Sequence, residues 1–154
     1  MQKRVFIIHG WSGNPKNAWF PWIKNELENS MGCRTIIKYL GELEDNEKAG
    51  GTVFVAGWVS LTPMAMGNKE EKEIVRQWLA VEVDYGKAKK LGKKFIAIFS
   101  DDDEFVPFEE NSKFYKEKLG AEIILEHNKG HFDDDKGIKE LPVALSAMLE
   151  IAGE

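Results

Sequence analysis

Short, uninterrupted runs of apolar residues recur along the chain and predict strands that are buried on both faces. The first run covers residues 5–8. Three more runs follow at 52–56, 95–99 and 121–125. Continuous apolar runs of this length are typical of parallel sheets, which helices cover on both sides. The pattern therefore predicts a mostly parallel sheet.

The segments between these runs show the helical spacing of apolar residues. Apolar stripes are expected within 19–27, 36–40 and 74–79, and along Leu145, Met148 and Leu149. Gly120 follows the segment 113–119 and suits a left-handed helix cap. Pro142 suits the first turn of a last helix. Strands that alternate with helices predict an α/β fold whose functional residues lie at the carboxyl ends of the strands.

The composition indicates one soluble domain that spans residues 1–154. Hydrophobic residues make up 43% of the chain and charged residues 31%, which is ordinary for a globular protein. The net charge is −5, and the basic residues are scattered, which argues against nucleic-acid binding. The first apolar run is too short for a signal peptide or a membrane span. Cys33 is the only cysteine, so a reducing, cytoplasmic location is expected.

Three residue types that acyl transfer requires occur in a recognised order along the chain. Ser30 comes first, Asp103 follows the run at 95–99, and His131 follows the run at 121–125. The order Ser, Asp, His is that of the α/β-hydrolase triad. A glycine-rich phosphate loop is missing after the first run, which argues against a nucleotide-binding protein.

Four motifs give the sequence a more specific resemblance. They are HGWSGNP at 9–15, SMGC at 30–33, SDDDEFVP at 100–107 and GHF at 130–132. Together they resemble the small serine hydrolases related to retinoblastoma-binding protein nine, in which the nucleophile elbow reads Gly-His-Ser-Met-Gly-Cys. The four motifs occur in the family's order and span nearly the whole chain. An α/β-hydrolase-like three-layer sandwich is the fold that this resemblance implies.

The resemblance also implies a role for each candidate residue. Ser30 would be the nucleophile, His131 the general base and then acid, and Asp103 the group that orients the imidazole. The backbone N–H groups of Trp11 and Met31 would form the oxyanion hole. The expected substrates are small esters or amides, cleaved through an acyl-enzyme without a metal or an organic cofactor.

Several of these features have simpler interpretations. Residues 101–103 could form a solvated turn or a loose calcium-type cluster, and residues 133–135 fit a hydrated turn better. Cys33 is conceivable as a nucleophile but is expected to be buried. Residues 58–68 could wall the substrate site, although a plain connecting loop is the simpler interpretation.

The sequence departs from the family pattern immediately before Ser30. A nucleophile elbow needs a buried strand ahead of the serine, whereas 22–29 has a helical pattern. Glu28 and Asn29 replace the expected glycine and histidine. The comparison with the family pattern indicates a deletion of about forty residues here, a strand–helix–strand unit. Either the protein has a segment that this sequence lacks, or the polypeptide itself lacks it and has fewer strands.

The second account leads to a different functional class. Without its strand, Ser30 would lie within a helix, and the chain would be a catalytically impaired, hydrolase-like binding or interaction module. Exposed strand edges would then favour pairing with a second copy, so a homodimer is one open outcome. The sequence leaves the substrate and the oligomeric state undecided.

Overall fold

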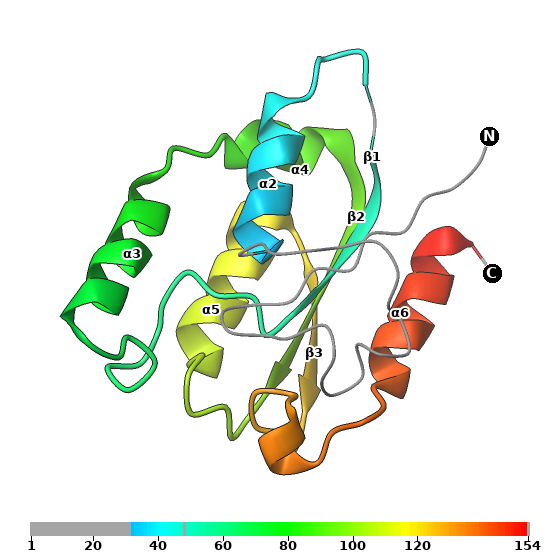
Figure 1. Cartoon of the computed structure of the whole chain (residues 1–154). Coiled ribbons are helices and arrows are strands. Elements are labelled where there is room, and N and C mark those ends of the chain that lie inside the picture. The colour runs from blue at the N-terminus through cyan, green and yellow to red at the C-terminus, as the bar shows by residue number, and fades with distance from the viewer. Residues whose placement is uncertain (1–31, 48, 154) are drawn as a thin grey trace.

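Among the described residues, three parallel strands form the sheet at the centre of the fold (Figure 1). The computed structural model describes residues 32–47 and 49–153. The strands are β1 (Ala49–Val55), β2 (Gly92–Ser100) and β3 (Glu122–Glu126), in the order β1-β2-β3. Three of the four predicted strands are thus confirmed, and the predicted strand at 5–8 lies outside the described residues.

Helices connect and flank these strands. They are α2 (Gly32–Glu42), α3 (Lys69–Ala80), α4 (Tyr85–Leu91), α5 (Phe108–Phe114), the π-helix η1 (Tyr115–Leu119), the 3₁₀-helix η2 (Asp134–Lys136) and α6 (Pro142–Ala152). The sequence pattern did not predict α4 or η2. Within the described part of the chain, none of these helices is long and apolar enough to cross a membrane.

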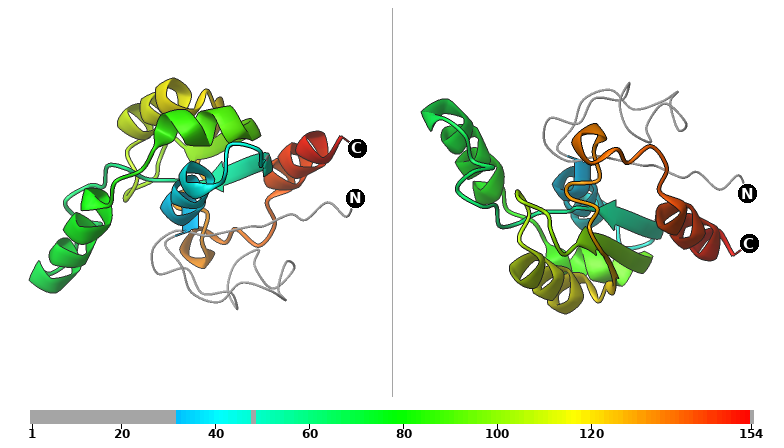
Figure 2. Two further views of the ribbon diagram at one scale, coloured as in Figure 1. Left: turned by 90° about the horizontal axis from the view of Figure 1, so that it is seen from above. Right: turned by 90° about the horizontal axis from the view of Figure 1, so that it is seen from below.

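The sheet is the middle of three layers, as the alternation of side chains along β2 shows. Phe95, Ala97 and Phe99 pack into a core with α2, α4 and η1. Ile96 and Ile98 point to the opposite face and pack into a second core with α6. Figure 2 shows α6 on one side of the sheet and α4 and α5 on the other. The predicted α/β architecture with a mostly parallel sheet is confirmed.

Local sequence explains where these helices begin and end. Asn68 caps α3, because its side chain accepts the N–H groups of Glu70 and Glu71, and the Glu71 carboxylate accepts the Asn68 N–H in return. Gly120 ends η1 in the left-handed conformation, with φ of 68°, as the sequence predicted. Pro142 lies in the first turn of α6, also as predicted.

The apolar stripe predicted on α6 is buried only in part, since Met148 packs against the second core but the two leucines do not. Leu145 and Leu149 are 37% and 40% exposed, whereas Ala144 and Ala147 are buried. The small residues let α6 approach the sheet closely: a Cβ atom added to Gly51 of β1 would lie 2.4 Å from Ile151 Cγ2. Close approach therefore selects alanines for the buried face and leaves the large leucines in solvent.

The stripe on α3 also packs less than its pattern suggested. Ile74 and Leu79 are 43% and 41% exposed, and Val75 is the buried side chain of this helix. Figures 1 and 2 show α3 extending away from the sheet and from the other helices.

Candidate active site

Two loops lie side by side at the carboxyl edge of the sheet because they follow neighbouring parallel strands. Ser100 at the end of β2 is paired with Glu126 at the end of β3. The backbone ladder continues one step further, since the Asp101 N–H donates to the Glu126 carbonyl at 3.2 Å. The acid loop (residues 100–107) and the histidine loop (residues 127–132) therefore leave the sheet together.

Asp103 and His131 form a hydrogen-bonded pair between these loops. His131 Nδ1 lies 2.9 Å from Asp103 Oδ2, and the two side chains are 18% and 2% exposed. The other carboxylate oxygen, Oδ1, accepts the N–H groups of Phe105 at 2.9 Å and Val106 at 3.0 Å. Hydrogen bonds to both oxygens therefore fix the orientation of the Asp103 carboxylate. Because Nδ1 is held by Asp103, Nε2 is the imidazole nitrogen left to exchange a proton.

Phe105 packs against the other side of this pair. Its ring meets the His131 imidazole edge to face, with centroids 5.4 Å apart and an interplanar angle of 86°. The imidazole is thus held by a hydrogen bond at one nitrogen and by an aromatic edge, which limits its rotation.

Each of the three residues before Asp103 accepts one backbone N–H group of the histidine loop. Asp101 Oδ1 accepts the Asn128 N–H at 2.9 Å, and Ser100 Oγ accepts the Lys129 N–H at 3.0 Å. Asp102 Oδ1 accepts the Gly130 N–H and the Ser100 hydroxyl, both at 2.7 Å. Together with the pair of Asp103 and His131, these bonds form a continuous clasp between residues 100–103 and 127–131.

Two charged contacts reinforce this clasp at its exposed side. Asp102 Oδ2 lies 3.2 Å from Lys136 Nζ. The Gly130 N–H above all, then the Ser100 hydroxyl and Lys136, lower the pKa of Asp102 to about 2. Asp101 lies 2.5 Å from His127 Nδ1, and their hydrogen bond lowers the pKa of Asp101 and raises that of His127.

The structure decides between the interpretations of the two acidic runs. Residues 101–103 are neither a free solvated turn nor a calcium-type cluster, because each carboxylate binds the histidine loop. In the parts of the chain that are described, no group of three or more potential ligands could hold a metal ion. At 133–135, Asp133 caps η2, as expected of an exposed turn.

The histidine loop has an unusual backbone that the clasp supports. Asn128, Gly130 and Phe132 have φ values of 56°, 53° and 55°. At Gly130 a Cβ atom would lie 2.4 Å from Lys136 Cγ, so the glycine is needed for space as well as for conformation. Such strained residues persist where surrounding contacts fix them, and they often occur at functional sites.

Ser30, Trp11 and Met31 lie outside the described residues, so the structure does not place the expected nucleophile or oxyanion donors relative to His131. Cys33, on α2, is 5% exposed, and burial raises the pKa of its thiol to about 12. The prediction that Cys33 is buried is therefore confirmed. A thiol that stays protonated is a poor nucleophile.

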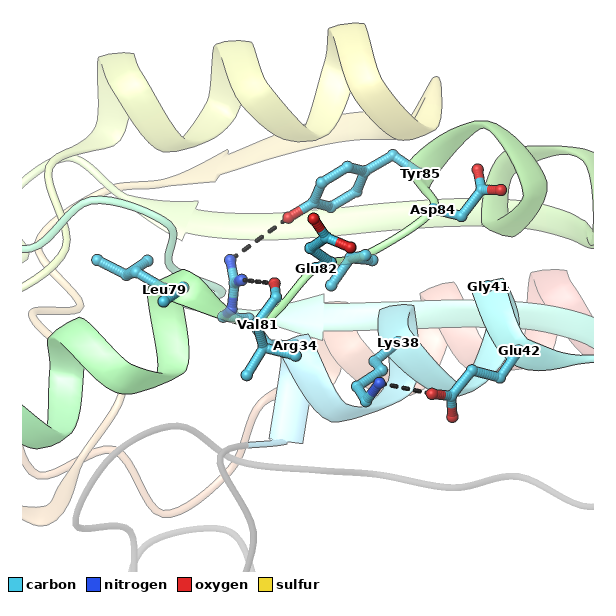
Figure 3. Close-up of a pocket in the computed structure, with 11 residues that line it drawn as sticks. Arg34, Lys38, Gly41, Glu42, Leu79, Val81, Glu82, Asp84 and Tyr85 are labelled. Carbon is cyan, nitrogen blue, oxygen red and sulfur yellow. Dashed lines mark hydrogen bonds and ion pairs between the residues drawn. The ribbon is translucent and has the colours of Figure 1, made fainter.

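A separate hollow lies between α2 and the segment that joins α3 to α4 (Figure 3). Its volume is about 660 Å³, and neither Asp103 nor His131 lines it. Arg34, which is 7% exposed, donates to Tyr85 Oη and to the Val81 carbonyl, each at 3.4 Å. Lys38 is paired with Glu42 across one turn of α2. Acidic and basic groups are mixed around this hollow, and the candidate active site lies elsewhere.

The fold is that of an α/β protein with a hydrogen-bonded Asp–His pair at the carboxyl edge of its parallel sheet. A family model described as "Serine hydrolase" matches residues 28–150, most of the chain. The chain belongs to this serine hydrolase family.

A protein of Bacillus subtilis (strain 168) gives a second comparison. YdeN, a candidate hydrolase by its name, is 25% identical over 189 residues, with 96% of this chain and 95% of YdeN covered. The crystal structure of the B. subtilis ydeN gene product superposes with a TM-score of 0.81 at 23% identity, covering 99% of this chain and 100% of that one. The structural similarity supports the fold.

Sequence reasoning missed several residues of the clasp. Ser100 and Asp102 lie in the motif at 100–107 but were given no role, because their partners are backbone N–H groups that become neighbours only when β2 and β3 pair. Asn111, buried on α5, was also missed, because its sequence neighbours are polar residues and nothing in that pattern indicates burial.

Proposed function

We propose that the protein is a serine hydrolase that cleaves small esters or amides through an acyl-enzyme. Ser30 is the nucleophile, His131 the general base and then acid, and Asp103 the residue that orients the imidazole. The backbone N–H groups of Trp11 and Met31 stabilise the oxyanion. The reaction needs no metal and no organic cofactor.

The observation that carries this proposal is the part-buried contact between Asp103 Oδ2 and His131 Nδ1 at 2.9 Å. A carboxylate that already accepts two backbone N–H groups has a fixed direction, and it stabilises the imidazolium that forms during acyl transfer. Membership of the serine hydrolase family supports the same chemistry.

A second candidate function is a hydrolase-like binding module without a formed nucleophile elbow. Two observations favour it. The family match begins at residue 28, just before Ser30. The alignment with YdeN extends over 189 residues although this chain has 154, as an internal deletion would require. In such a chain the Asp103–His131 pair would lack a serine to activate.

Labelling of the purified protein with a fluorophosphonate probe distinguishes the two functions. The serine hydrolase proposal expects covalent labelling that is lost in Ser30→Ala and in His131→Ala. Ser146→Ala is the matched control, because Ser146 is an exposed serine of α6 outside the four motifs and should leave labelling intact. Folded wild-type protein that takes up no probe would exclude the hydrolase and support the binding module.

An intact-mass measurement addresses the segment before Ser30 directly. A polypeptide of 17.5 kDa would show that the chain lacks the segment. A species several kilodaltons heavier would show that the protein contains a segment absent from this sequence, and would favour a formed elbow.

A further inference from the structure

The loop after β1 is fastened to the acid loop at a point close to the Asp–His pair. The Thr62 N–H donates to the Phe105 carbonyl at 3.0 Å. The Thr62 hydroxyl donates to the Glu104 carbonyl at 2.7 Å and accepts the Ala65 N–H at 3.3 Å. This contact joins residues 42 positions apart in the sequence.

A buried asparagine on α5 also holds the loop after β1 in place. Asn111 is 0% exposed, and its Oδ1 accepts the N–H groups of Val59 at 2.7 Å and Ser60 at 3.0 Å. Its Nδ2 donates to the Ser60 carbonyl at 2.9 Å and to the Pro107 carbonyl at 2.7 Å. All four hydrogen-bonding positions of the amide are used, so residues 59–60 are tied to the end of the acid loop.

Phe105 links the Thr62 contact to the Asp103–His131 pair. Its N–H donates to Asp103 Oδ1, its carbonyl accepts from Thr62, and its ring lies against His131. A shift of the Phe105 peptide would therefore move both the carboxylate and the aromatic edge that hold the imidazole. No other residue in the described ranges makes all three of these contacts.

We infer that Thr62 is a positioning residue for the proposed reaction, acting on His131 through Phe105, with Asn111 holding the loop that carries it. The inference rests on the proposed function in that His131 is taken to be the general base. Residues 59–62 thus support the active site in addition to connecting β1 to α3.

The test is a comparison of two conservative variants. Thr62→Val keeps the shape and the backbone bond to Phe105, but it removes the hydroxyl bond to the Glu104 carbonyl. That carbonyl belongs to the same peptide unit as the Phe105 N–H that binds Asp103, so losing the hydroxyl bond loosens the Asp103 contact. Thr62→Ser keeps the hydroxyl. Since one hydrogen bond is lost at a distance from the reacting atoms, Thr62→Val should lower kcat about three- to tenfold with little change in KM. Thr62→Ser should restore most of the lost rate. Ester hydrolysis measured across a pH series gives both constants.

A proton NMR measurement tests the inference without requiring activity. The His131 Nδ1 proton in its bond to Asp103 should give a downfield signal that shifts or broadens in Thr62→Val and returns in Thr62→Ser. Hydrogen exchange of the Phe105 and Val106 amides should accelerate in Thr62→Val and in Asn111→Ala. If Asn111→Ala fails to fold, the two Thr62 variants still decide the matter.

Asn68→Ala is the matched control, because it removes a side-chain cap from α3 just beyond the same loop and touches neither Phe105 nor Asp103. It should leave kcat and the His131 signal unchanged. Unchanged kinetics and an unchanged signal in Thr62→Val would overturn the inference, as would equal effects from Asn68→Ala. An inactive wild type would instead count against the proposed function, and the NMR result would still test the role of Thr62.

Discussion

Asp103 uses its two oxygens for different purposes: one accepts backbone N–H groups and the other faces His131. In Asp103→Asn the amide would present an NH₂ group either to the two N–H donors or to Nδ1. The second orientation selects the wrong imidazole tautomer. Under the proposed function we expect kcat to fall by about four orders of magnitude with the fold retained. Ester hydrolysis together with circular dichroism checks this.

Asp133→Asn is the control for this change, since Asp133 lies two residues after His131 and caps an exposed 3₁₀ turn. Its activity should stay near that of the wild type. Equal losses in both variants would show that the acidic character of the region matters and the Asp103 contact does not.

Asp102 predicts a specific pH dependence of stability. Its folded pKa is about 2, below the ordinary value of 3.8, so the carboxylate stabilises the fold above pH 3.8. This contribution is lost as the pH falls from 3.8 through about 2. Asp102→Asn should lower the melting temperature at pH 7 and flatten its decline between these two pH values.

Thermal melts from pH 2 to 7 measure this dependence, with the exposed Asp135→Asn as control. A wild-type melting curve that loses no more stability than Asp102→Asn over this acid range would contradict the assignment.

Sequence reasoning reached the residue scale only in part. Asp103 and His131 could be found because each follows an apolar run and their order fits a known chemistry. The roles of Ser100 and Asp102 depend on backbone atoms that the β2–β3 register brings near. A one-dimensional pattern contains no information on that register. Ser30 stays a prediction from its motif alone.

At the scale of elements, α6 shows why a periodic pattern predicts a helix better than it predicts the buried face. Its leucines formed the more obvious stripe, yet the alanines face the sheet. Ala147→Leu should destabilise the protein by about 1–3 kcal/mol, because the added atoms have no room against Ile96 and Ile98 and would push the helix away from the sheet. Leu145→Gln should change the free energy of unfolding by about 0.5 kcal/mol or less.

Urea denaturation of the two variants measures this difference. If the leucine face were the buried one, the order would reverse, with Leu145→Gln the more damaging change.

At the scale of the whole molecule, β1 and β3 are the outer strands of the described sheet. If the polypeptide has only these 154 residues, the strand that would deliver the nucleophile is missing and an edge is left to pair with a second copy. We then expect a concentration-dependent dimer in sedimentation velocity. Monomer at all concentrations from a chain of 17.5 kDa would contradict this expectation.

The separation of α3 from the three layers has a practical consequence for engineering. Val75 is the side chain by which this helix is buried, and the helix begins and ends in connecting segments. Apart from Val75, which belongs to the first core, the sheet, the two cores and the clasp are built from other parts of the described chain. A fluorescent reporter or an affinity module inserted within α3 would therefore lie at a distance from the Asp–His pair, in a solvent-exposed position.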